Sequence, residues 1–212
     1  MTTTLLYLVR HGQTVWHREN RYAGVSDVAL TEVGRAQAER LAAWVADTRI
    51  DAVWVSPLRR ARETAAPAAA VLRLPLRVAD DLAEVDFGEA EGRTLAELPE
   101  AQAAAFRADP VGGAFPGAEN PAAAAARGAA AVRRIARRHD AGQALVVAHN
   151  TLLRLTLCEL LGIPLSRYRT VFPQLANGAV TELRLTDEQA SLIRYNVPLA
   201  ARVPADEAAP PG

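Results

Sequence analysis

The stretch Leu5-Leu6-Tyr7-Leu8-Val9-Arg10-His11-Gly12 contains five consecutive apolar residues that end at two basic side chains and a glycine. A short continuous apolar run is typical of a strand that is buried on both faces of a sheet. Similar runs at 52–55 and 144–148 also stop at polar residues. Strands of this kind occur in parallel sheets whose two faces are covered by helices.

Helical patterns separate the first strands. Thr31 is expected to cap a helix over 32–47, in which apolar residues recur with the spacing of one helix face. Ser56 is predicted as the N-cap of another helix, with the proline after it as the first helical residue. That helix carries 59–66, and Pro67 is expected to kink it or to begin a separate segment, because proline cannot donate the helical hydrogen bond.

The rest of the chain continues this alternation. Asn120 and Asn150 are predicted to cap two further helices, which end near Arg138 and at Gly162. The segment 84–118 is expected to be irregular, with two short helices. Weaker strands are expected at 75–78, 179–185 and 191–195, the last two as a hairpin.

The predicted fold class is therefore α/β, a three-layer α/β/α sandwich with a mostly parallel central sheet. We expect one domain over residues 1–197. The Pro- and Ala-rich segment 198–212 is expected to be a disordered tail.

The composition excludes several classes of function. Arginine supplies all 24 basic residues, so the chain has no lysine for a P-loop or a Schiff base. The 24 acidic residues balance them, so there is no global field for nucleic acid or an anionic membrane. Cys158 has no partner for an internal disulfide and is expected in the core. Without a long apolar run, the chain is expected to act in the cytoplasm.

Polar residues gather where the strands end. Arg10 and His11 follow the first strand, His149 follows the strand 144–148, and Arg60 lies just after the second strand. Glu84 stands a few residues beyond the third strand. Because ligands of such sheets bind outside the carboxyl ends of the strands, these side chains are expected at one rim.

These residue types suit a phosphoryl group. Arginine is permanently charged and can hold phosphate oxygens through two N–H groups. A neutral histidine keeps one ring nitrogen with a free lone pair, and a carboxylic acid can protonate a leaving oxygen. The helix after His149 would direct the positive end of its dipole toward the same anion. The combination predicts phosphoryl transfer.

Five motifs, spread over about residues 5–185, resemble those of the histidine phosphatase superfamily, which includes the cofactor-dependent phosphoglycerate mutases. In chain order they are LVRHGQT at 8–14, LTEVGRAQA at 30–38, SPLRRARETA at 56–65, LAEVDFGEAEG at 82–92 and VVAH at 146–149. The resemblance implies a phosphoglycerate mutase-like fold.

The resemblance also implies a role for each matching residue. His11 attacks phosphorus and becomes phosphorylated. Arg10, Arg60 and His149 bind the phosphoryl oxygens, while Arg59 is expected to be a solvated neighbour. Glu84 protonates the leaving alkoxide and later deprotonates the water that hydrolyses phosphohistidine.

Three further positions are expected to bind substrate. His17 stands where many members have an asparagine that touches the phosphate, and its charge is expected to vary near neutral pH. Asn150 stands where many have glycine, and its side chain would narrow the pocket mouth. The segment that ends at Gly24 is expected to shape the pocket, and Gly24 is included among the substrate-binding residues.

The predicted function is a phosphatase that hydrolyses small phosphorylated metabolites, and two alternatives stay open. The second function is a bisphosphoglycerate-dependent mutase, which is less favoured because the resemblance associates mutases with a long insertion between the acid and the second histidine, and here only 65 positions separate Glu84 from His149. The third is a catalytically silent phosphate-binding module, which would be expected to have lost His11, Glu84 or an arginine. No metal is expected, since His11, His17 and His149 lack a recognised ligand spacing, and no cofactor is expected. The oligomeric state stays open, a homo-oligomer included.

Overall fold

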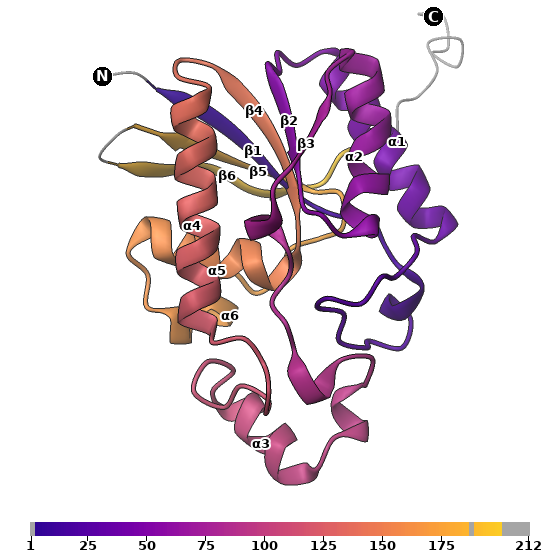
Figure 1. Cartoon of the computed structure of the whole chain (residues 1–212), viewed down its shortest axis with the longest axis vertical. Coiled ribbons are helices and arrows are strands. Elements are labelled where there is room, and N and C mark those ends of the chain that lie inside the picture. The colour runs from indigo at the N-terminus through magenta and orange to yellow at the C-terminus, as the bar shows by residue number, and fades with distance from the viewer. Residues whose placement is uncertain (1–2, 187–188, 201–212) are drawn as a thin grey trace, which may run out of the picture.

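The computed structural model describes residues 3–186 and 189–200. Its centre is a six-stranded sheet with the order β3-β2-β4-β1-β5-β6 (Figure 1). The first four strands in this order are parallel, β5 pairs antiparallel with β1, and β6 pairs antiparallel with β5. The mostly parallel sheet and the terminal hairpin are therefore confirmed. The strands are β1 Thr4–Arg10, β2 Ala52–Val55, β3 Leu76–Val78, β4 Gln143–Ala148, β5 Val180–Leu185 and β6 Ala190–Val197.

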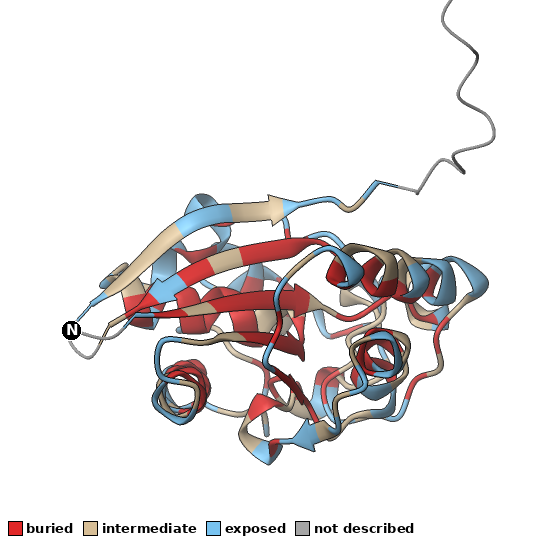
Figure 2. Cartoon of the chain, turned by 90° about the horizontal axis from the view of Figure 1, so that it is seen from above, coloured by how far each residue is buried: buried red, intermediate tan, exposed pale blue. Residues whose placement is uncertain are grey.

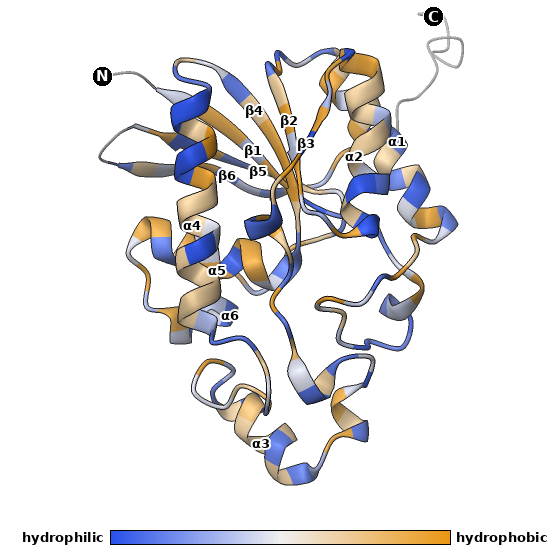
Figure 3. Cartoon of the chain, in the orientation of Figure 1, coloured by the Kyte–Doolittle hydropathy of each residue, from blue (hydrophilic) through white to orange (hydrophobic). Residues whose placement is uncertain are grey.

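Helices cover both faces of the sheet. Alternate residues of β1 serve the two faces, because successive side chains in a strand point to opposite sides. Leu6 and Leu8 belong to one hydrophobic cluster, and Tyr7 and Val9 to the other. Figure 2 shows the buried strands between the helices, and Figure 3 shows how apolar those strands are. The three-layer sandwich is therefore confirmed. The helices are α1 Glu32–Ala46, α2 Arg59–Leu72, α3 Glu100–Ala108, α4 Pro121–Arg138, α5 Asn150–Leu161 and α6 Tyr168–Val171.

Two predicted helix starts are wrong by one or two residues. The N-cap of α2 is Leu58 rather than Ser56, so the helix begins after Pro57. The Ser56 hydroxyl instead accepts the N–H of Leu58 and contacts a histidine of the site. The N-cap of α5 is His149, and Asn150 is its first residue. Thr31 and Asn120 are N-caps as predicted, with their side chains accepting backbone N–H groups.

Pro67 does not begin a separate segment, so that alternative of the prediction is wrong, while the predicted kink stays a prediction. The helix runs through it to Leu72. Ala65, Ala68 and Ala69, on both sides of the proline, are buried in the core cluster. Packing of this apolar face holds the helix together despite the one hydrogen bond that proline removes.

The segment 84–118 lies beyond the carboxyl edge of the sheet, at the bottom of Figure 1. It contains α3 and the single-turn helices Gly88–Ala90 and Leu95–Glu97, so it is irregular as predicted. An aromatic cluster joins it to the segment after β1: the Tyr22 ring lies 5.1 Å from the ring centroids of Phe87 and Phe115. The segment thus forms a wall over the rim at which β1, β2 and β4 end.

Two predictions about the periphery have different outcomes. Cys158 is fully buried in the core, as predicted. Of the predicted tail 198–212, residues 201–212 lie outside the described residues. Leu199, which is described, packs against the core cluster that includes residues of α1 and α2. None of the helices within the described ranges is long and apolar enough to cross a bilayer.

Candidate active site

Strand register brings the two rim histidines together. β1 and β4 are parallel, with Arg10 opposite Ala148, so the residues that follow them are neighbours. The N–H of His11 donates to the carbonyl of Ala148, and the rings of His11 and His149 lie 5.1 Å apart. The site is thus built from residues that lie far apart in the chain.

The tautomer of His11 is fixed by the backbone. Its Nδ1 donates to the Gly12 carbonyl at 2.7 Å, which leaves Nε2 with a free lone pair. The ring is 5% exposed and lines the cavity described below. Burial, followed by the charges of Arg60 and Arg10, holds the pKa of His11 well below 6.5. His11 is therefore a neutral imidazole at neutral pH, in the state that a nucleophile requires.

His149 lies beside His11 but is completely buried. Its Nε2 contacts the Ser56 hydroxyl at 2.7 Å, and its Nδ1 has no partner among the described residues. Burial lowers its pKa well below 6.5, with Arg60 as the next cause. When the Ser56 hydroxyl donates to Nε2, Nδ1 carries the hydrogen and can donate to an oxyanion.

The two predicted phosphate-binding arginines are placed differently. Arg10 lines the cavity and donates to the Leu175 carbonyl at 2.6 Å. Burial lowers its pKa to about 10, so it stays charged at neutral pH. Arg60 is fully buried and does not line the cavity; its terminal nitrogens donate to carbonyls of the segment 23–26. Its charge nevertheless lowers the pKa of both His11 and His149. Arg59 is exposed and pairs with Glu63, as expected of a solvated neighbour.

The Glu84 carboxylate sits at the N-terminus of α5. Oε2 accepts the N–H of Thr151 at 3.0 Å, and Oε1 accepts the N–H of Leu152 at 2.8 Å. Oε1 also accepts the N–H of Val85. Because these backbone groups are fixed, the carboxylate is held in one orientation at the cavity wall. Oε2 has only one protein donor among the described residues, so it is free to face a bound molecule.

Arg127, which the sequence analysis did not single out, positions the Glu84 loop. Its guanidinium donates to the carbonyls of Asp81, Ala83 and Glu84, and it pairs with Glu119. The signal in the sequence was a lone arginine in the alanine-rich stretch of α4. Composition alone gave no reason to distinguish it from a surface residue.

His17 lines the cavity and bridges two polar groups. Nε2 lies 2.7 Å from an Arg10 guanidinium nitrogen and 3.2 Å from the Asn177 amide nitrogen. Nδ1 faces the Thr14 backbone N–H at 3.0 Å and the Thr14 hydroxyl at 2.8 Å. Because both ring nitrogens face N–H donors, neither neutral tautomer satisfies all of these contacts. Burial and the nearby charge of Arg10 lower the pKa of His17 to about 4. The expectation that its charge varies near neutral pH is therefore wrong.

Gly24 and Asn150 have different positions. Gly24 does not line the cavity: its carbonyl accepts from Arg60, and its N–H is held by the Glu91 carboxylate. A side chain at Gly24 would collide with the Val85 carbonyl, so its role is close backbone packing. Asn150 lines the cavity, and its Oδ1 is buried with no partner among the described residues.

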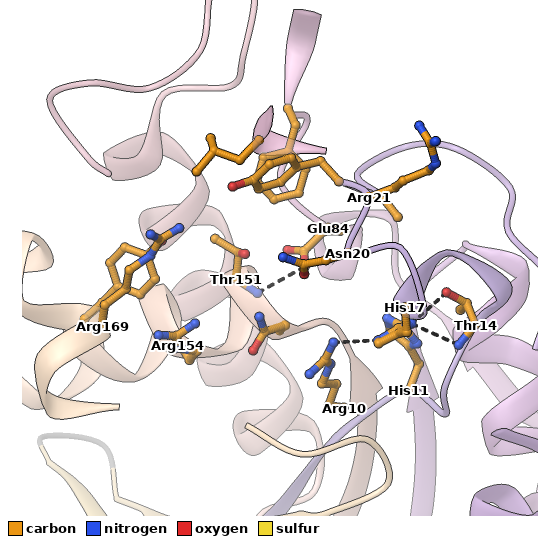
Figure 4. A pocket seen from close by; sticks show the side chains of 16 residues that line it. Arg10, His11, Thr14, His17, Asn20, Arg21, Glu84, Thr151, Arg154 and Arg169 are labelled. Carbon is orange, nitrogen blue, oxygen red and sulfur yellow. Dashed lines mark hydrogen bonds between the residues drawn. The ribbon is translucent and has the colours of Figure 1, made fainter. Parts of the chain in front are cut away.

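The cavity has a volume of about 350 Å³ and opens over His11 (Figure 4). In this view the His11 and His17 imidazoles lie on one side, and Arg154 and Arg169 lie on the other. Neither arginine is among the site residues predicted from the sequence. The lining residues are Arg10, His11, Thr14, His17, Asn20, Arg21, Tyr22, Ala23, Glu84, Phe87, Leu95, Asn150, Thr151, Arg154, Tyr168 and Arg169.

Within residues 3–186 and 189–200, no group of three or more His, Cys, Asp or Glu side chains could hold a metal ion.

Comparison with known proteins gives consistent matches. The model of the histidine phosphatase superfamily (branch 1) matches residues 6–198. Phosphoserine phosphatase 1 of Hydrogenobacter thermophilus is 32% identical over 195 residues, which cover 91% of this chain and 92% of that protein. A probable phosphoglycerate mutase of Erwinia tasmaniensis is 32% identical over 168 residues, 77% of this chain and 78% of its own. The structure of a mycobacterial glucosyl-3-phosphoglycerate phosphatase superposes with a TM-score of 0.82 at 27% identity, covering 92% of this chain and 99% of that one.

Proposed function

The chain belongs to the histidine phosphatase superfamily (branch 1), and we propose that it hydrolyses small-molecule phosphomonoesters through a phosphohistidine intermediate on His11. It is a phosphoric monoester hydrolase of the histidine phosphatase type. The observation that carries the mechanism is the neutral His11 ring, whose free Nε2 lies at a cavity lined by Arg10. The retained His11, Glu84, Arg10 and Arg60 argue against a silent binding module.

The proposed reaction has two steps. In the first, the His11 Nε2 lone pair forms a bond to phosphorus, and the bond from phosphorus to the ester oxygen breaks. Glu84, in its protonated form, gives its proton to the leaving oxygen. In the second, the Glu84 carboxylate takes a proton from water, which attacks phosphorus and releases inorganic phosphate and neutral His11.

Fixed positive charge supports both steps. Arg10 contacts the cavity, while the buried charge of Arg60 lies beside both histidines. The negative charge on the oxygens of the transferring phosphoryl group is thus stabilised by positive groups that do not need to reorganise during the reaction. His149 would add a hydrogen bond through Nδ1.

The proposal is tested first by phosphate release from p-nitrophenyl phosphate, a generic phosphomonoester. We expect turnover by the purified protein. A complete absence of phosphate release from this ester and from a panel of phosphorylated metabolites would contradict the proposed function and favour the binding module.

The pH dependence should show a nucleophile with a lowered pKa. Since the pKa of His11 lies well below 6.5, lowering the pH from 7 through 6.5 does not protonate it. We therefore expect kcat/KM to be retained into mildly acidic solution, with the loss caused by His11 protonation only at lower pH. The measurement uses two esters whose phosphate groups have different pKa values, so that substrate ionisation is recognised. A loss of kcat/KM centred at pH 6.5 with both esters would contradict the assignment of His11 as a nucleophile with a lowered pKa. So would a value of kcat/KM that still rises above pH 8.

Metal independence is part of the proposal. The chemistry described uses only protein side chains and water, so we expect extensive dialysis against EDTA to leave the rate of phosphate release unchanged. The control is inhibition by vanadate, a phosphate-like oxyanion, which should persist after the same treatment. Full inhibition by EDTA that is reversed by a divalent cation would contradict this part.

A bisphosphoglycerate-dependent mutase is the second candidate, since one relative is named a probable phosphoglycerate mutase. The phosphatase is favoured because only 65 positions separate Glu84 from His149, without the long insertion that the family resemblance associates with mutases. Interconversion of 2- and 3-phosphoglycerate, measured with and without bisphosphoglycerate, distinguishes the two reactions.

We also propose small phosphorylated metabolites as substrates, which the names of the relatives support. The proposal includes one catalytic domain over 1–197 and action in the cytoplasm. The single buried Cys158 is consistent with a compartment that does not require disulfides.

A further inference from the structure

Arg127 of α4 holds the main chain around Glu84. Its Nη1 donates to the carbonyls of Asp81 and Ala83, at 2.9 and 2.8 Å. Its Nη2 donates to the carbonyl of Glu84 at 3.2 Å. The Arg127 side chain does not line the cavity over His11. Arg127 therefore contacts the residue proposed as the acid only through the backbone.

Glu119 fixes the orientation of this arginine. Its two carboxylate oxygens accept from Nε and Nη2 of Arg127, at 2.7 and 2.8 Å. A bidentate pair of this kind sets the plane of the guanidinium as well as its position. All three guanidinium nitrogens of Arg127 thus have partners, so the carbonyls before and at Glu84 meet donors that are held in place.

The same contacts join the two ends of the cavity wall. The wall segment, residues 87–118, lies at the bottom of Figure 1, beyond the sheet. Its ends meet where the N–H of Glu119 donates to the carbonyl of Asp86 at 2.9 Å. Arg127 bonds to both ends, at Glu84 before the segment and at Glu119 after it. The acid and the wall are thus attached to one guanidinium.

Glu84 is held from two helices that pack against each other. N–H groups at the start of α5 hold its carboxylate, and Arg127 of α4 holds its carbonyl. The two helices approach closely at Gly128, where an added Cβ would collide with the Thr156 side chain. Because the helices are packed this tightly, the two ends of Glu84 are fixed relative to each other.

We propose that Arg127 and Glu119 are positioning residues for the acid of the reaction, holding Glu84 at the cavity and coupling it to the wall segment. This inference rests on the proposed function, because it takes Glu84 as the acid. Removal of the guanidinium releases three carbonyls and one end of the wall segment, so the Glu84 carboxyl group shifts relative to the ester oxygen. A shift of about 1 Å costs on the order of 100-fold in a step that depends on the shifted group.

The first test compares two esters that differ in their need for a proton. The leaving group of benzyl phosphate is an alkoxide, which requires protonation, whereas p-nitrophenyl phosphate releases nitrophenolate, which does not. The quantity measured is kcat/KM for benzyl phosphate divided by kcat/KM for p-nitrophenyl phosphate. This ratio reports the phosphorylation of His11 and excludes the later hydrolysis. Both constants come from one preparation, so partial loss of folded enzyme cancels.

In Arg127→Gln this ratio should fall roughly 10- to 100-fold. Glu119→Gln should lower it less, because the bonds from Arg127 to the carbonyls remain. Arg134→Gln is the matched control: Arg134 lies on the same helix and pairs with the Asp81 side chain in a partly exposed ion pair. Its ratio should stay within about threefold of the wild-type value. A ratio in Arg127→Gln that also stays within this range would overturn the inference.

A double substitution shows whether Arg127 acts through Glu84. Glu84→Gln alone should lower the ratio, and adding Arg127→Gln should lower it no further, because no acid is left to position. A further fall of roughly tenfold in the double variant would overturn the inference, since Arg127 would then act on the reaction by another route.

Amide hydrogen exchange separates the positioning of Glu84 from its chemistry. The N–H groups of Thr151 and Leu152 donate to the Glu84 carboxylate, and the N–H of Glu119 joins the ends of the wall segment. In Arg127→Gln these three amides should exchange roughly tenfold faster, and in Arg134→Gln they should not.

The two measurements fail in different ways. Faster exchange supports the positioning of Glu84 even if Glu84→Gln leaves the ester ratio unchanged, a result that would contradict the acid in the proposed function. Unchanged exchange at all three amides in Arg127→Gln, in a protein whose ester ratio does fall in Glu84→Gln, would overturn the inference and leave the proposed function standing.

Discussion

The His11→Ala variant is expected to lose roughly 10⁴- to 10⁶-fold in kcat, as enzymes do when the nucleophile of a coupled set is removed. The reason is geometric: the free Nε2 of His11 lies at the cavity, and neither neighbouring histidine can replace it. Nε2 of His149 is occupied by the Ser56 hydroxyl, and Nε2 of His17 is occupied by Arg10 and Asn177. The first measurement is the rate of phosphate release. The second is the amount of radiolabelled phosphate bound to the protein after turnover of a radiolabelled ester is stopped rapidly without acid.

Labelling tests the covalent step separately from the rate. The wild-type protein should carry phosphate that is labile in acid and stable in base, as expected for a phosphoramidate, and His11→Ala should carry none. His139→Ala is the control, because His139 is a half-buried histidine at the C-cap of α4 that bonds Trp54 and lies outside the cavity. Activity or labelling that survives His11→Ala would remove the mechanism.

The Glu84→Gln variant is expected to lose roughly 10²- to 10⁴-fold in kcat with alkyl phosphates, the usual contribution of general acid–base catalysis. An amide cannot give a proton to the leaving alkoxide. The loss should be much smaller for the first step with p-nitrophenyl phosphate, because nitrophenolate leaves without protonation. Burst kinetics with this ester report the first step apart from the hydrolysis of phosphohistidine.

The leaving-group dependence separates catalysis from folding. The amide introduced by Glu84→Gln would turn an NH₂ group toward N–H donors of Thr151 or Leu152, so some loss of stability is expected. Such a loss would lower the rates with alkyl and aryl esters equally. Glu89→Gln, at an exposed position in the same segment, should change neither rate. An equal reduction of the first step for both ester classes in Glu84→Gln would refute its role as the acid.

The sequence predicted the elements that depend on local pattern. The apolar runs of β1, β2 and β4 were found because a strand buried on both faces is continuously hydrophobic. Placing His11 and His149 at one rim followed from the rule for parallel strands, and their ring separation of 5.1 Å agrees with it. The wrong N-cap at Ser56 and the wrong alternative of a separate segment at Pro67 arose where a local preference was overridden by packing around α2.

What the sequence by itself determined is the architecture, the family and the identity of the reacting side chains, because strand and helix periods and ordered motifs are properties of contiguous residues. Only the tertiary structure decided the state and surroundings of those side chains. The lowered pKa of His17 and the backbone N–H groups that hold Glu84 arise from burial beside residues distant in the chain. Desolvation and hydrogen bonding depend on which atoms replace water around a group, and that is set when α5, β1 and the segment after β3 meet at one edge of the sheet.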